Sequence, residues 1–406
     1  MQANKRLLLL ATILAVIVPA YAGSEAVLHA FSNGNDGGNP LDAGTLLKKG
    51  AEFYGTAVFG GKNGCGTIFK FSASNLKTLH AFDCSGEGAN PSGGVVADGS
   101  GVLYGTTTYG GPDGCGTVFK LSGYKFTTLY SFGCGADGAS PAAGVILDKN
   151  KNLYGTAALG GAKGGGVAYM ISPTREYTVI YDFCSRAACS DGQYPYSGLT
   201  MDTEGNLYGT TYEGGVKGCY QKVGCGTVFE LSLLNGKWSE TILYRFTGQN
   251  GDGSYPESAG LTIQDGMTGK NAKEAIFGVT SEGGAAGDGI VFELVKAKKG
   301  NTLTIIHSFD VSAGDGGSPM GTLIGGKGAL IGTTQAGGQD GYGTVFELTG
   351  PRTEGESWAE TVLYSFTGGG DGGYPESGVA RDSAGNLYGV TFSGGRGYGV
   401  AYSLLP

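Results

Sequence analysis

The sequence predicts an all-β protein, folded as a seven-bladed β-propeller of four-stranded antiparallel blades. Three observations support this expectation: 81 of the 406 residues are glycine, one segment recurs seven times, and the two ends of the chain carry complementary parts of one repeat. A glycine inside a helix costs about 1 kcal/mol relative to alanine, whereas glycine suits tight turns between strands. The 23 tyrosines and 18 phenylalanines can bury a large core, which argues against disorder.

The first 22 residues predict a secretory signal peptide. Two basic residues at positions 5 and 6 precede an apolar run over 7–18, and a small-residue A-x-A site follows at 20–22. The run is shorter than the roughly 20 residues that span a bilayer, so export is a better expectation than membrane anchoring. We therefore expect a mature chain over 23–406 that forms a single propeller domain and is secreted or periplasmic.

The charge of the chain limits its partners. The sequence has 27 basic and 35 acidic residues, a net charge of −8. No later segment is apolar for as long as the first, and none is a run of basic residues. We therefore expect no membrane span in the mature chain, and neither nucleic acid nor an anionic membrane as a partner.

A repeat of about 50 residues runs through the chain. Its most regular segment is a variant of L-Y-G-T-T, whose glycine stands at positions 55, 105, 155, 209, 278, 332 and 389. A period near 50 residues is typical of a four-stranded propeller blade. Seven copies therefore predict seven blades.

The second repeat contains the four expected strands in order. Residues 93–97 form a short first strand beside the central channel, and residues 103–107 form the second strand after a D-G-S-G turn. Residues 116–121 form the third strand, with the alternation of a half-buried strand, and residues 126–132 form the fourth, at the outer rim. The connections are rich in Gly, Asp, Asn and Ser, which allows antiparallel hairpins.

The two ends of the chain hold complementary parts of one blade. The last repeat stops after its third strand, at 399–404, and residues 26–31 match the fourth-strand motif of other repeats, such as 78–82. We expect this N-terminal strand to complete the last blade, because the ring then closes without an exposed edge between its first and last blades.

Four motifs, P-x-x-G, N-L-Y-G-T-T, G-G-x-x-G-x-G-T-V-F and L-Y-S-F, recur over essentially all of residues 24–406. In these motifs the chain resembles the GloVer-type (choice-of-anchor) tandem-repeat family of secreted bacterial proteins. The resemblance implies a propeller-like fold and export. It implies no established chemistry, so no catalytic residue follows from it.

Eight cysteines lie within the first four repeats. Two pairs occupy equivalent positions in repeats one and two, before the third strand and after the fourth, which antiparallel pairing places side by side. Repeats three and four each hold two cysteines close together. The simplest set of disulfides is Cys65–Cys84, Cys115–Cys134, Cys184–Cys189 and Cys219–Cys225. An even number of cysteines after a signal peptide favours disulfides, and no histidine stands nearby to support a zinc site.

The three histidines restrict the chemistry. His29, His80 and His307 all occupy one position of the fourth strand, where other repeats have tyrosine. They belong to three separate blades and cannot converge, so a histidine-based metal site or a Ser-His-Asp triad is not expected. We interpret them as packing residues and predict no catalytic residue.

Two tryptophans occur in one motif, W-x-E-T-[IV]-L-Y-x-F. Trp238 and Trp358 both stand at the start of outer strands, and their repetition at the rim predicts packing residues that extend two long hairpins. The longest interval between repeats includes an insertion around 265–273 whose role the sequence does not indicate.

An acidic residue followed by glycine recurs in the loop that leads into each first strand. In every copy a proline stands three residues after that glycine. We favour turn chemistry, in which the acid accepts backbone hydrogen bonds and glycine supplies positive φ. The alternative is a calcium site, which makes calcium the one cofactor to test. The members are Asp36, Glu87, Asp137, Asp191, Asp252, Asp315 and Asp371. A second acidic set, interpreted as hairpin turns on the opposite face, comprises Asp98, Asp148, Asp202 and Asp382.

Departures from the repeat gather on the face where the fourth-to-first and second-to-third connections meet. Around the loop proline and before the paired glycines, several repeats carry tyrosine or glutamate. Aromatic faces and carboxylates at a channel mouth can bind a sugar; alternatively, the tyrosines cover neighbouring blades. The candidate ligand-binding residues are Tyr109, Tyr194, Tyr196, Tyr212, Glu213, Tyr255, Glu257, Glu282, Tyr374 and Glu376.

These features favour a secreted binding or interaction module that recognises carbohydrate or another component of the cell envelope, such as an envelope protein. A fold alone does not determine function, so two alternatives stay open. One is a calcium-dependent extracellular hydrolase or lyase, lactonase-like or acting on polysaccharide. The other is a purely structural extracellular repeat protein.

Overall fold

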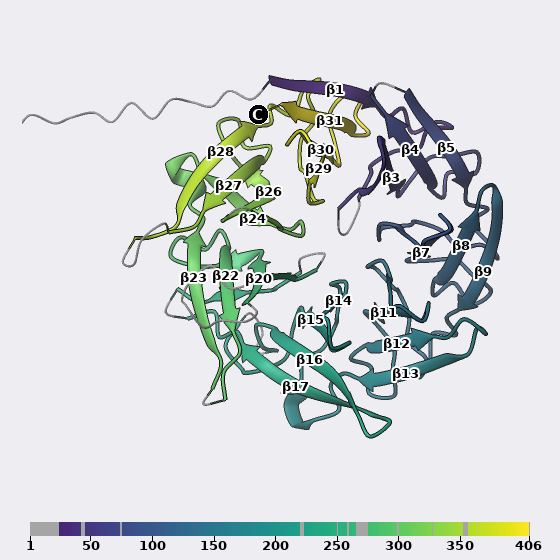
Figure 1. Cartoon of the computed structure of the whole chain (residues 1–406), viewed down its shortest axis with the longest axis vertical. Coiled ribbons are helices and arrows are strands. Elements are labelled where there is room, and N and C mark those ends of the chain that lie inside the picture. Colours follow the sequence, from purple (N-terminus) through teal and green to yellow (C-terminus); the bar gives the residue numbers. More distant parts are fainter. Residues whose placement is uncertain are drawn as a thin grey trace, which may run out of the picture.

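The computed structural model describes residues 24–41, 45–73, 75–219, 223–249, 251–257, 260–264, 275–298, 300–326, 328–351 and 356–405. The predicted signal peptide and the insertion around 265–273 lie outside the described residues. The described chain forms a ring of seven antiparallel blades (Figure 1). The strands of blades 1 to 6 follow the sequence from the channel to the rim, whereas the rim strand of blade 7 is the N-terminal strand. The predicted seven-bladed propeller is therefore confirmed.

Each blade begins with a short inner strand beside the channel and ends with a longer strand at the rim. Blade 1 comprises β2 (Leu47–Lys49), β3 (Glu52–Ala57), β4 (Thr67–Ser72) and β5 (Asn75–Ala81), and blade 2 comprises β6 (Val96–Ala97), β7 (Leu103–Thr107), β8 (Thr117–Ser122) and β9 (Lys125–Ser131). Blade 3 comprises β10 (Ile146–Leu147), β11 (Leu153–Ala157), β12 (Val167–Ile171) and β13 (Tyr177–Asp182), and blade 4 comprises β14 (Thr200–Met201), β15 (Leu207–Thr211), β16 (Thr227–Leu234) and β17 (Lys237–Arg245). Blade 5 comprises β19 (Thr262–Gln264), β20 (Ala275–Thr280), β22 (Ile290–Val295) and β23 (Thr302–Ser308), and blade 6 comprises β25 (Ile324–Gly326), β26 (Ala329–Gly337), β27 (Thr344–Thr349) and β28 (Ala359–Ser365). Blade 7 comprises β29 (Ala380–Arg381), β30 (Leu387–Val390), β31 (Val400–Leu405) and β1 (Ser24–Ala30). Short strands β18 (Gly253–Ser254) and β21 (Glu282–Gly283) pair with each other, and β24 (Gly316–Pro319) pairs with β26.

The N-terminal strand closes the ring. β1 pairs with β31 in antiparallel register, from Ser24 opposite Leu405 to Ala30 opposite Val400. Figure 1 shows these two ends of the chain side by side between the first and sixth blades. The last blade is thus completed by the strand that the sequence analysis assigned to it.

The first strands are shorter than expected. In blade 2 the ladder includes only Val96–Ala97, not the predicted 93–97. Residues before Val96 lie against the next blade near the channel, where a Cβ at Gly93 would stand 2.3 Å from the backbone nitrogen of Gly144. Because the blades converge at the axis, their backbones contact each other there instead of extending the ladder.

A phenylalanine at the end of each fourth strand packs against a third-strand ring of the following blade. Phe82 and Phe119 are fully buried, and their ring centroids are 5.4 Å apart. The equivalent pairs are Phe31–Phe69, Phe132–Tyr169, Phe183–Phe229, Phe246–Phe292, Phe309–Phe346 and Phe366–Tyr402, at 5.0–5.5 Å. The hydrophobic core therefore continues from blade to blade around the whole ring.

The recurring glycine of the L-Y-G-T-T segment makes room for that third-strand ring. A Cβ at Gly105 would lie 2.6 Å from Cζ of Phe119, which no side chain tolerates without a shift of the ring. Glycine in a strand interior often marks such a close approach. The packing between blades therefore accounts for the most regular element of the repeat.

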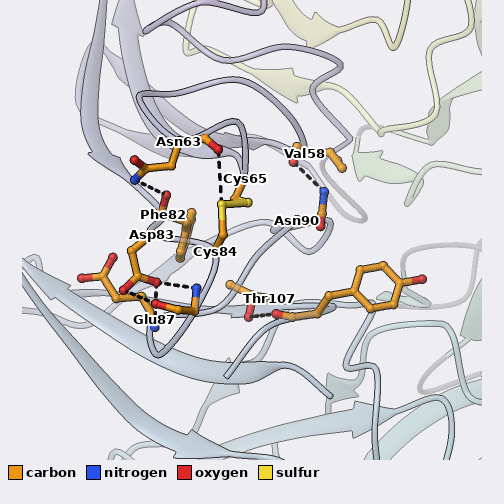
Figure 2. The surroundings of a disulfide bond; sticks show 11 residues. Val58, Asn63, Cys65, Phe82, Asp83, Cys84, Glu87, Asn90 and Thr107 are labelled. Atoms are coloured by element: carbon orange, nitrogen blue, oxygen red, sulfur yellow. Dashed lines mark hydrogen bonds between the residues drawn. A yellow bond between two sulfur atoms is a disulfide. The ribbon is translucent and has the colours of Figure 1, made fainter. Parts of the chain in front are cut away.

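Four disulfides join the predicted pairs, Cys65–Cys84, Cys115–Cys134, Cys184–Cys189 and Cys219–Cys225. Figure 2 shows the first of them, which connects the start of the third strand with the loop after the fourth. Disulfides of this number fit an extracellular or periplasmic protein. Among the described residues, no helix has the length and apolar composition needed to cross a membrane.

Candidate ligand-binding mouth

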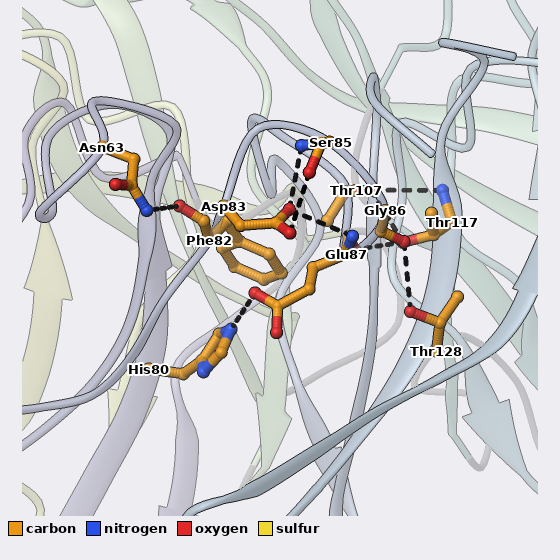
Figure 3. Close-up of polar contacts among 10 residues, drawn as sticks. All are labelled: Asn63, His80, Phe82, Asp83, Ser85, Gly86, Glu87, Thr107, Thr117 and Thr128. Carbon is orange, nitrogen blue, oxygen red and sulfur yellow. Dashed lines mark hydrogen bonds and ion pairs between the residues drawn. The ribbon is translucent and has the colours of Figure 1, made fainter. Parts of the chain in front are cut away.

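The acidic residue of each recurring loop is held by the fourth strand that precedes the loop. His80 on β5 contacts Glu87 through its Nε2 atom at 2.9 Å, as Figure 3 shows. The equivalent pairs, at 2.8–3.2 Å, are His29–Asp36, Tyr130–Asp137, Tyr181–Asp191, Tyr244–Asp252, His307–Asp315 and Tyr364–Asp371. The histidines do pack against the phenylalanine two residues later, but they also have this polar role, which the sequence analysis did not predict.

Backbone amides and hydroxyl groups of the same loop also donate to several of these acids. The Ser32 hydroxyl and backbone amide both donate to Asp36. Burial opposes ionisation of Asp36, but the hydrogen bonds from Ser32 and His29 outweigh it and hold the pKa of this carboxyl below its usual value. Turn chemistry is the interpretation that this geometry supports. Within the described ranges, no group of three or more His, Cys, Asp or Glu side chains is arranged to hold a metal ion, and calcium binding stays a prediction.

The second acidic set lies in the hairpins between first and second strands. Asp202 accepts hydrogen bonds from the backbone and side-chain nitrogens of Asn206, both at 2.8 Å, and from the Tyr208 hydroxyl at 2.9 Å. Asp98, Asp148 and Asp382 accept equivalent backbone bonds. These contacts agree with the hairpin interpretation.

The residue before the loop proline has a left-handed backbone in every blade. Its φ lies between 50° and 58° at Asn39, Asn90, Ser140, Tyr194, Tyr255, Ser318 and Tyr374. Asparagine adopts this conformation at low cost, whereas a bulky side chain does so under strain. Tyrosine therefore occupies a strained position at the entrances to blades 4, 5 and 7.

The strained position links neighbouring blades through its backbone. The Tyr255 amide donates to the carbonyl of Cys225 in blade 4, at 3.0 Å, and its carbonyl accepts from the Ser281 amide in blade 5, at 3.1 Å. Tyr194 and Tyr374 make equivalent bonds. The backbone explains the left-handed conformation, but it gives no reason for a tyrosine side chain there.

Three of the predicted tyrosines form one aromatic cluster at the mouth of blades 4 and 5. The Tyr212 ring lies edge-on to Tyr196 at 5.7 Å and tilted against Tyr255 at 4.8 Å. Tyr255 is only 7% exposed, so its ring supports that of Tyr212 from below the surface. Tyr374 instead contacts Tyr342 of blade 6, at 5.5 Å, a residue that the sequence analysis missed.

Glu257 at the mouth lies in the field of two other glutamates, Glu376 and Glu282. Burial raises the pKa of Glu257, and the negative charges of Glu376 and Glu282 raise it further. Burial also raises the pKa of Glu376, although this carboxylate accepts a hydrogen bond from Gln335 Nε2 at 2.6 Å. The three carboxyl groups come from loops of blades 5 and 7, on either side of blade 6.

The tyrosine and glutamate groups belong to one electrostatic environment. Burial, followed by the charge of Glu257, raises the pKa of Tyr196 and raises that of Tyr212 to about 12. Weaker effects of Glu213 and Tyr109 reach Tyr196. Glu213 itself accepts a hydrogen bond from Gln193 Nε2 at 2.9 Å. The two glutamine partners, Gln193 and Gln335, were not predicted, because amide side chains carry no distinctive sequence signal.

The central channel contains a cavity of about 200 Å³. It is lined by residues at or before the first strands, including Val95, Gly144, Gly198, Leu199 and Thr322. This lining has no titratable group. The titratable groups described above therefore lie at the mouth and not in this channel cavity.

These features define a seven-bladed β-propeller built from tandem repeats, with an aromatic and acidic mouth. The chain matches the family model described as the Gloeobacter/Verrucomicrobia repeat three times, over residues 17–133, 121–271 and 264–406, and it belongs to this family. The resemblance noted from the sequence motifs is thereby confirmed.

Comparisons with other proteins support the fold. A search of curated proteins gives no match. Among solved structures, the chain is similar to a candidate 6-phosphogluconolactonase from Bacteroides uniformis, with 12% identity, a TM-score of 0.50, and coverage of 84% of this chain and 88% of that one. It is also similar to a fungal alcohol oxidase of the AA5 family in complex with copper, with 11% identity, a TM-score of 0.54, and coverage of 95% and 76%. At these identities the similarity shows the fold alone.

Proposed function

We propose that the protein is an exported binding propeller whose mouth, formed by blades 4, 5 and 7, recognises carbohydrate of the cell envelope or its surroundings. The observation that carries this proposal is the placement of tyrosine at three strained backbone positions where other blades have Asn or Ser. Strain that persists at particular residues often accompanies function. The predicted signal peptide and the four disulfides support export.

The chemistry of the mouth suits a neutral sugar. The Tyr196 and Tyr212 rings offer apolar surface with a polar end, which fits the C–H face of a pyranose. Glu213 and Glu376 accept hydrogen bonds from hydroxyl groups, and the amides of Gln193 and Gln335 both donate and accept. The accumulated negative charge disfavours an anionic ligand.

Binding to neutral polysaccharides tests this proposal. The chain over 23–406 is titrated with neutral oligosaccharides of different linkage by calorimetry, together with the variants Tyr196→Ala and Glu257→Gln. We expect about tenfold weaker binding in each variant, a loss of about 1.4 kcal/mol. Glu204→Gln, in an exposed hairpin on the opposite face, is the matched control and should bind normally. Equal affinity in all four proteins, or no binding of any neutral saccharide, contradicts the proposal.

A polysaccharide hydrolase or lyase is the second candidate, favoured by one observation. Glu257, whose pKa is raised by burial and by Glu376 and Glu282, stands near a second carboxyl group with a different hydrogen-bond environment. Such pairs perform general acid and base chemistry. Release of reducing ends or unsaturated products, lost in Glu257→Gln and in Glu376→Gln with binding retained, would support it. Loss of that activity with a chelator would add the calcium requirement. The alternative of a lactonase-like activity is supported by the fold alone.

A further inference from the structure

A single aromatic or aliphatic position near the start of each second strand faces the following blade, on the side opposite the mouth. At four of these interfaces, a large side chain covers it. Phe53 of blade 1 stacks on Tyr388 of blade 7, at 4.1 Å, and Trp238 of blade 4 contacts Tyr154 of blade 3, at 5.9 Å. The other two covered pairs are Lys296 over Tyr208, at 4.9 Å, and Trp358 against Phe277, at 6.2 Å.

The interface between blades 1 and 2 is open at this position. Tyr54 of β3 lies in the wall of a cavity of about 190 Å³. The floor is apolar, with Leu103 and Leu121 from blade 2, and the rim includes Tyr124, which is 65% exposed. The hairpin after β8 is short and carries no tryptophan, so nothing like Trp238 reaches back to fill the space.

Lysines surround this cavity. Lys70 lies in its wall, 2.5 Å from a Glu52 carboxylate oxygen, and Lys77 has its Nζ atom 5.3 Å from the centre of the Tyr124 ring. Lys49 reaches the rim, where its Nζ atom would stand 2.3 Å from a Cβ at Gly101. Three ammonium groups thus face one carboxylate, in a chain whose net charge is −8. The lysines come from β2, β4 and β5, so no basic run in the sequence indicates this patch.

We propose that the cavity between blades 1 and 2 is a second ligand site, which binds an acidic sugar residue such as a hexuronate within a polysaccharide. The Tyr124 and Tyr54 rings and the leucine floor contact the apolar face of one sugar ring, and Lys77 and Lys70 bind its carboxylate. A pocket with apolar and aromatic walls and few polar groups is the usual form of a small-molecule site, and ammonium–carboxylate contacts are among the stronger hydrogen bonds. The site is independent of the mouth, where negative charge accumulates.

Affinity for an oligogalacturonide of defined length tests the second site. Calorimetry compares the chain over 23–406 with Tyr124→Ala and Lys77→Met, two substitutions at exposed positions that the fold tolerates. We expect each to bind about tenfold more weakly, and we expect affinity to fall as salt is added. The controls are Tyr124→Phe, which keeps the ring, and Lys163→Met, an exposed lysine of a loop at the mouth; both should bind normally.

A variant that fills the cavity provides a second line of evidence. Leu79 lines the cavity, so the larger side chain of Leu79→Phe should fill part of it and abolish binding, and a melting curve checks that this variant is folded. Unchanged affinity in Tyr124→Ala, Lys77→Met and Leu79→Phe would overturn the proposal, because the oligogalacturonide would then bind elsewhere. Equally strong competition by inorganic phosphate would also overturn it, since the patch would then be an anion site without recognition of sugar. Tyr196→Ala at the mouth should leave this affinity unchanged, which separates the two sites.

Discussion

Two positions at the interfaces between blades differ in how strictly the repeat determines them. The inner position, where a phenylalanine meets a third-strand ring, is aromatic on both sides at all seven interfaces. The outer position, near the start of the fourth strand, faces the His or Tyr and acid pair of the preceding blade and varies widely. Phe126 stacks on His80 at 4.3 Å and Tyr177 stacks on Tyr130 at 3.9 Å, whereas Glu360 faces His307 and Asp315.

The inner contacts are needed to assemble the ring, whereas the outer positions can vary from blade to blade. A ring of blades requires the same geometry at every interface, so the inner contact and the glycine beside it cannot change independently. The outer contact lies at the rim, where different side chains are accommodated by the same backbone. Properties peculiar to this chain are therefore expected at outer and loop positions, and the inner contacts are expected to carry most of the stability.

Truncation of an inner ring should give the largest effect. Phe183 is fully buried against Phe229, and Phe183→Ala should lower the free energy of unfolding by about 3–5 kcal/mol, because it removes apolar contacts and leaves a cavity. Urea denaturation of the chain over 23–406 measures this loss. Phe59→Ala, at a ring that is 42% exposed at the mouth, is the control and should cost less than about 1 kcal/mol. Similar losses in both variants would remove the distinction between inner and peripheral contacts.

A disulfide is specific to certain blades, and its loss should have the next largest effect. Cys115 and Cys134 enclose a sequence separation of 19 residues, and a loop of this length contributes about 3 kcal/mol by restricting the unfolded chain. The double variant Cys115→Ser with Cys134→Ser should therefore unfold at a lower urea concentration. Blade 5 has Asp288 at the position equivalent to Cys115 and folds in the same way, so the loss should reduce stability without changing the fold, as circular dichroism can check. An unchanged urea midpoint would contradict the expectation.

The fold was predictable from the sequence because its determinants repeat. The spacing of glycines predicted the seven blades, and the partial repeats at both ends predicted the closure by β1. The cysteines predicted the disulfides, because two pairs occupy equivalent positions and two pairs stand close together in the sequence. Elements that depend on a single interface were not predictable. The hydrogen bond from Gln335 to Glu376 and the open cavity beside Tyr54 arise from side chains more than 40 residues apart or from a missing neighbour, and neither leaves a local pattern.

The glutamates at outer positions should make stability depend on pH. Burial, followed by the negative charge of Asp315, raises the pKa of Glu360 to about 7 against a smaller opposing effect of His307. Burial, followed by the negative charge of Asp371, raises the pKa of Glu25 to about 7 as well. The folded protein then holds protons that the unfolded chain releases above about pH 4.5. The free energy of unfolding therefore decreases as the pH rises from 4.5 to 7. Glu360→Gln should flatten this decline and increase stability at pH 7.5 by about 1–2 kcal/mol.

Unfolding in urea at pH 5 and pH 7.5 measures the effect of Glu360→Gln. Glu176→Gln, at an exposed position of the same outer region in blade 3, is the matched control and should leave the pH dependence unchanged. If the free energy of unfolding decreases equally in the wild type and in Glu360→Gln, ionisation of this carboxyl group costs little in the folded state. A glutamate at the outer position would then affect stability no more than one at the surface.

The strained tyrosines should give the smallest effect, and its sign distinguishes strain from packing. Tyr194 has a φ of 58° at a position where blades 1 and 2 have asparagine. Asparagine adopts the left-handed region more readily, so Tyr194→Asn should stabilise the fold by about 0.5 kcal/mol if the ring contributes no packing energy. Tyr194→Ala removes the ring but keeps the strain, and it should not stabilise. If Tyr194→Asn increases stability and weakens saccharide binding, the tyrosine serves binding although it reduces the stability of the fold. If both variants reduce stability, the ring instead contributes packing between blades 3 and 4. That outcome would remove the main argument for a binding site at the mouth.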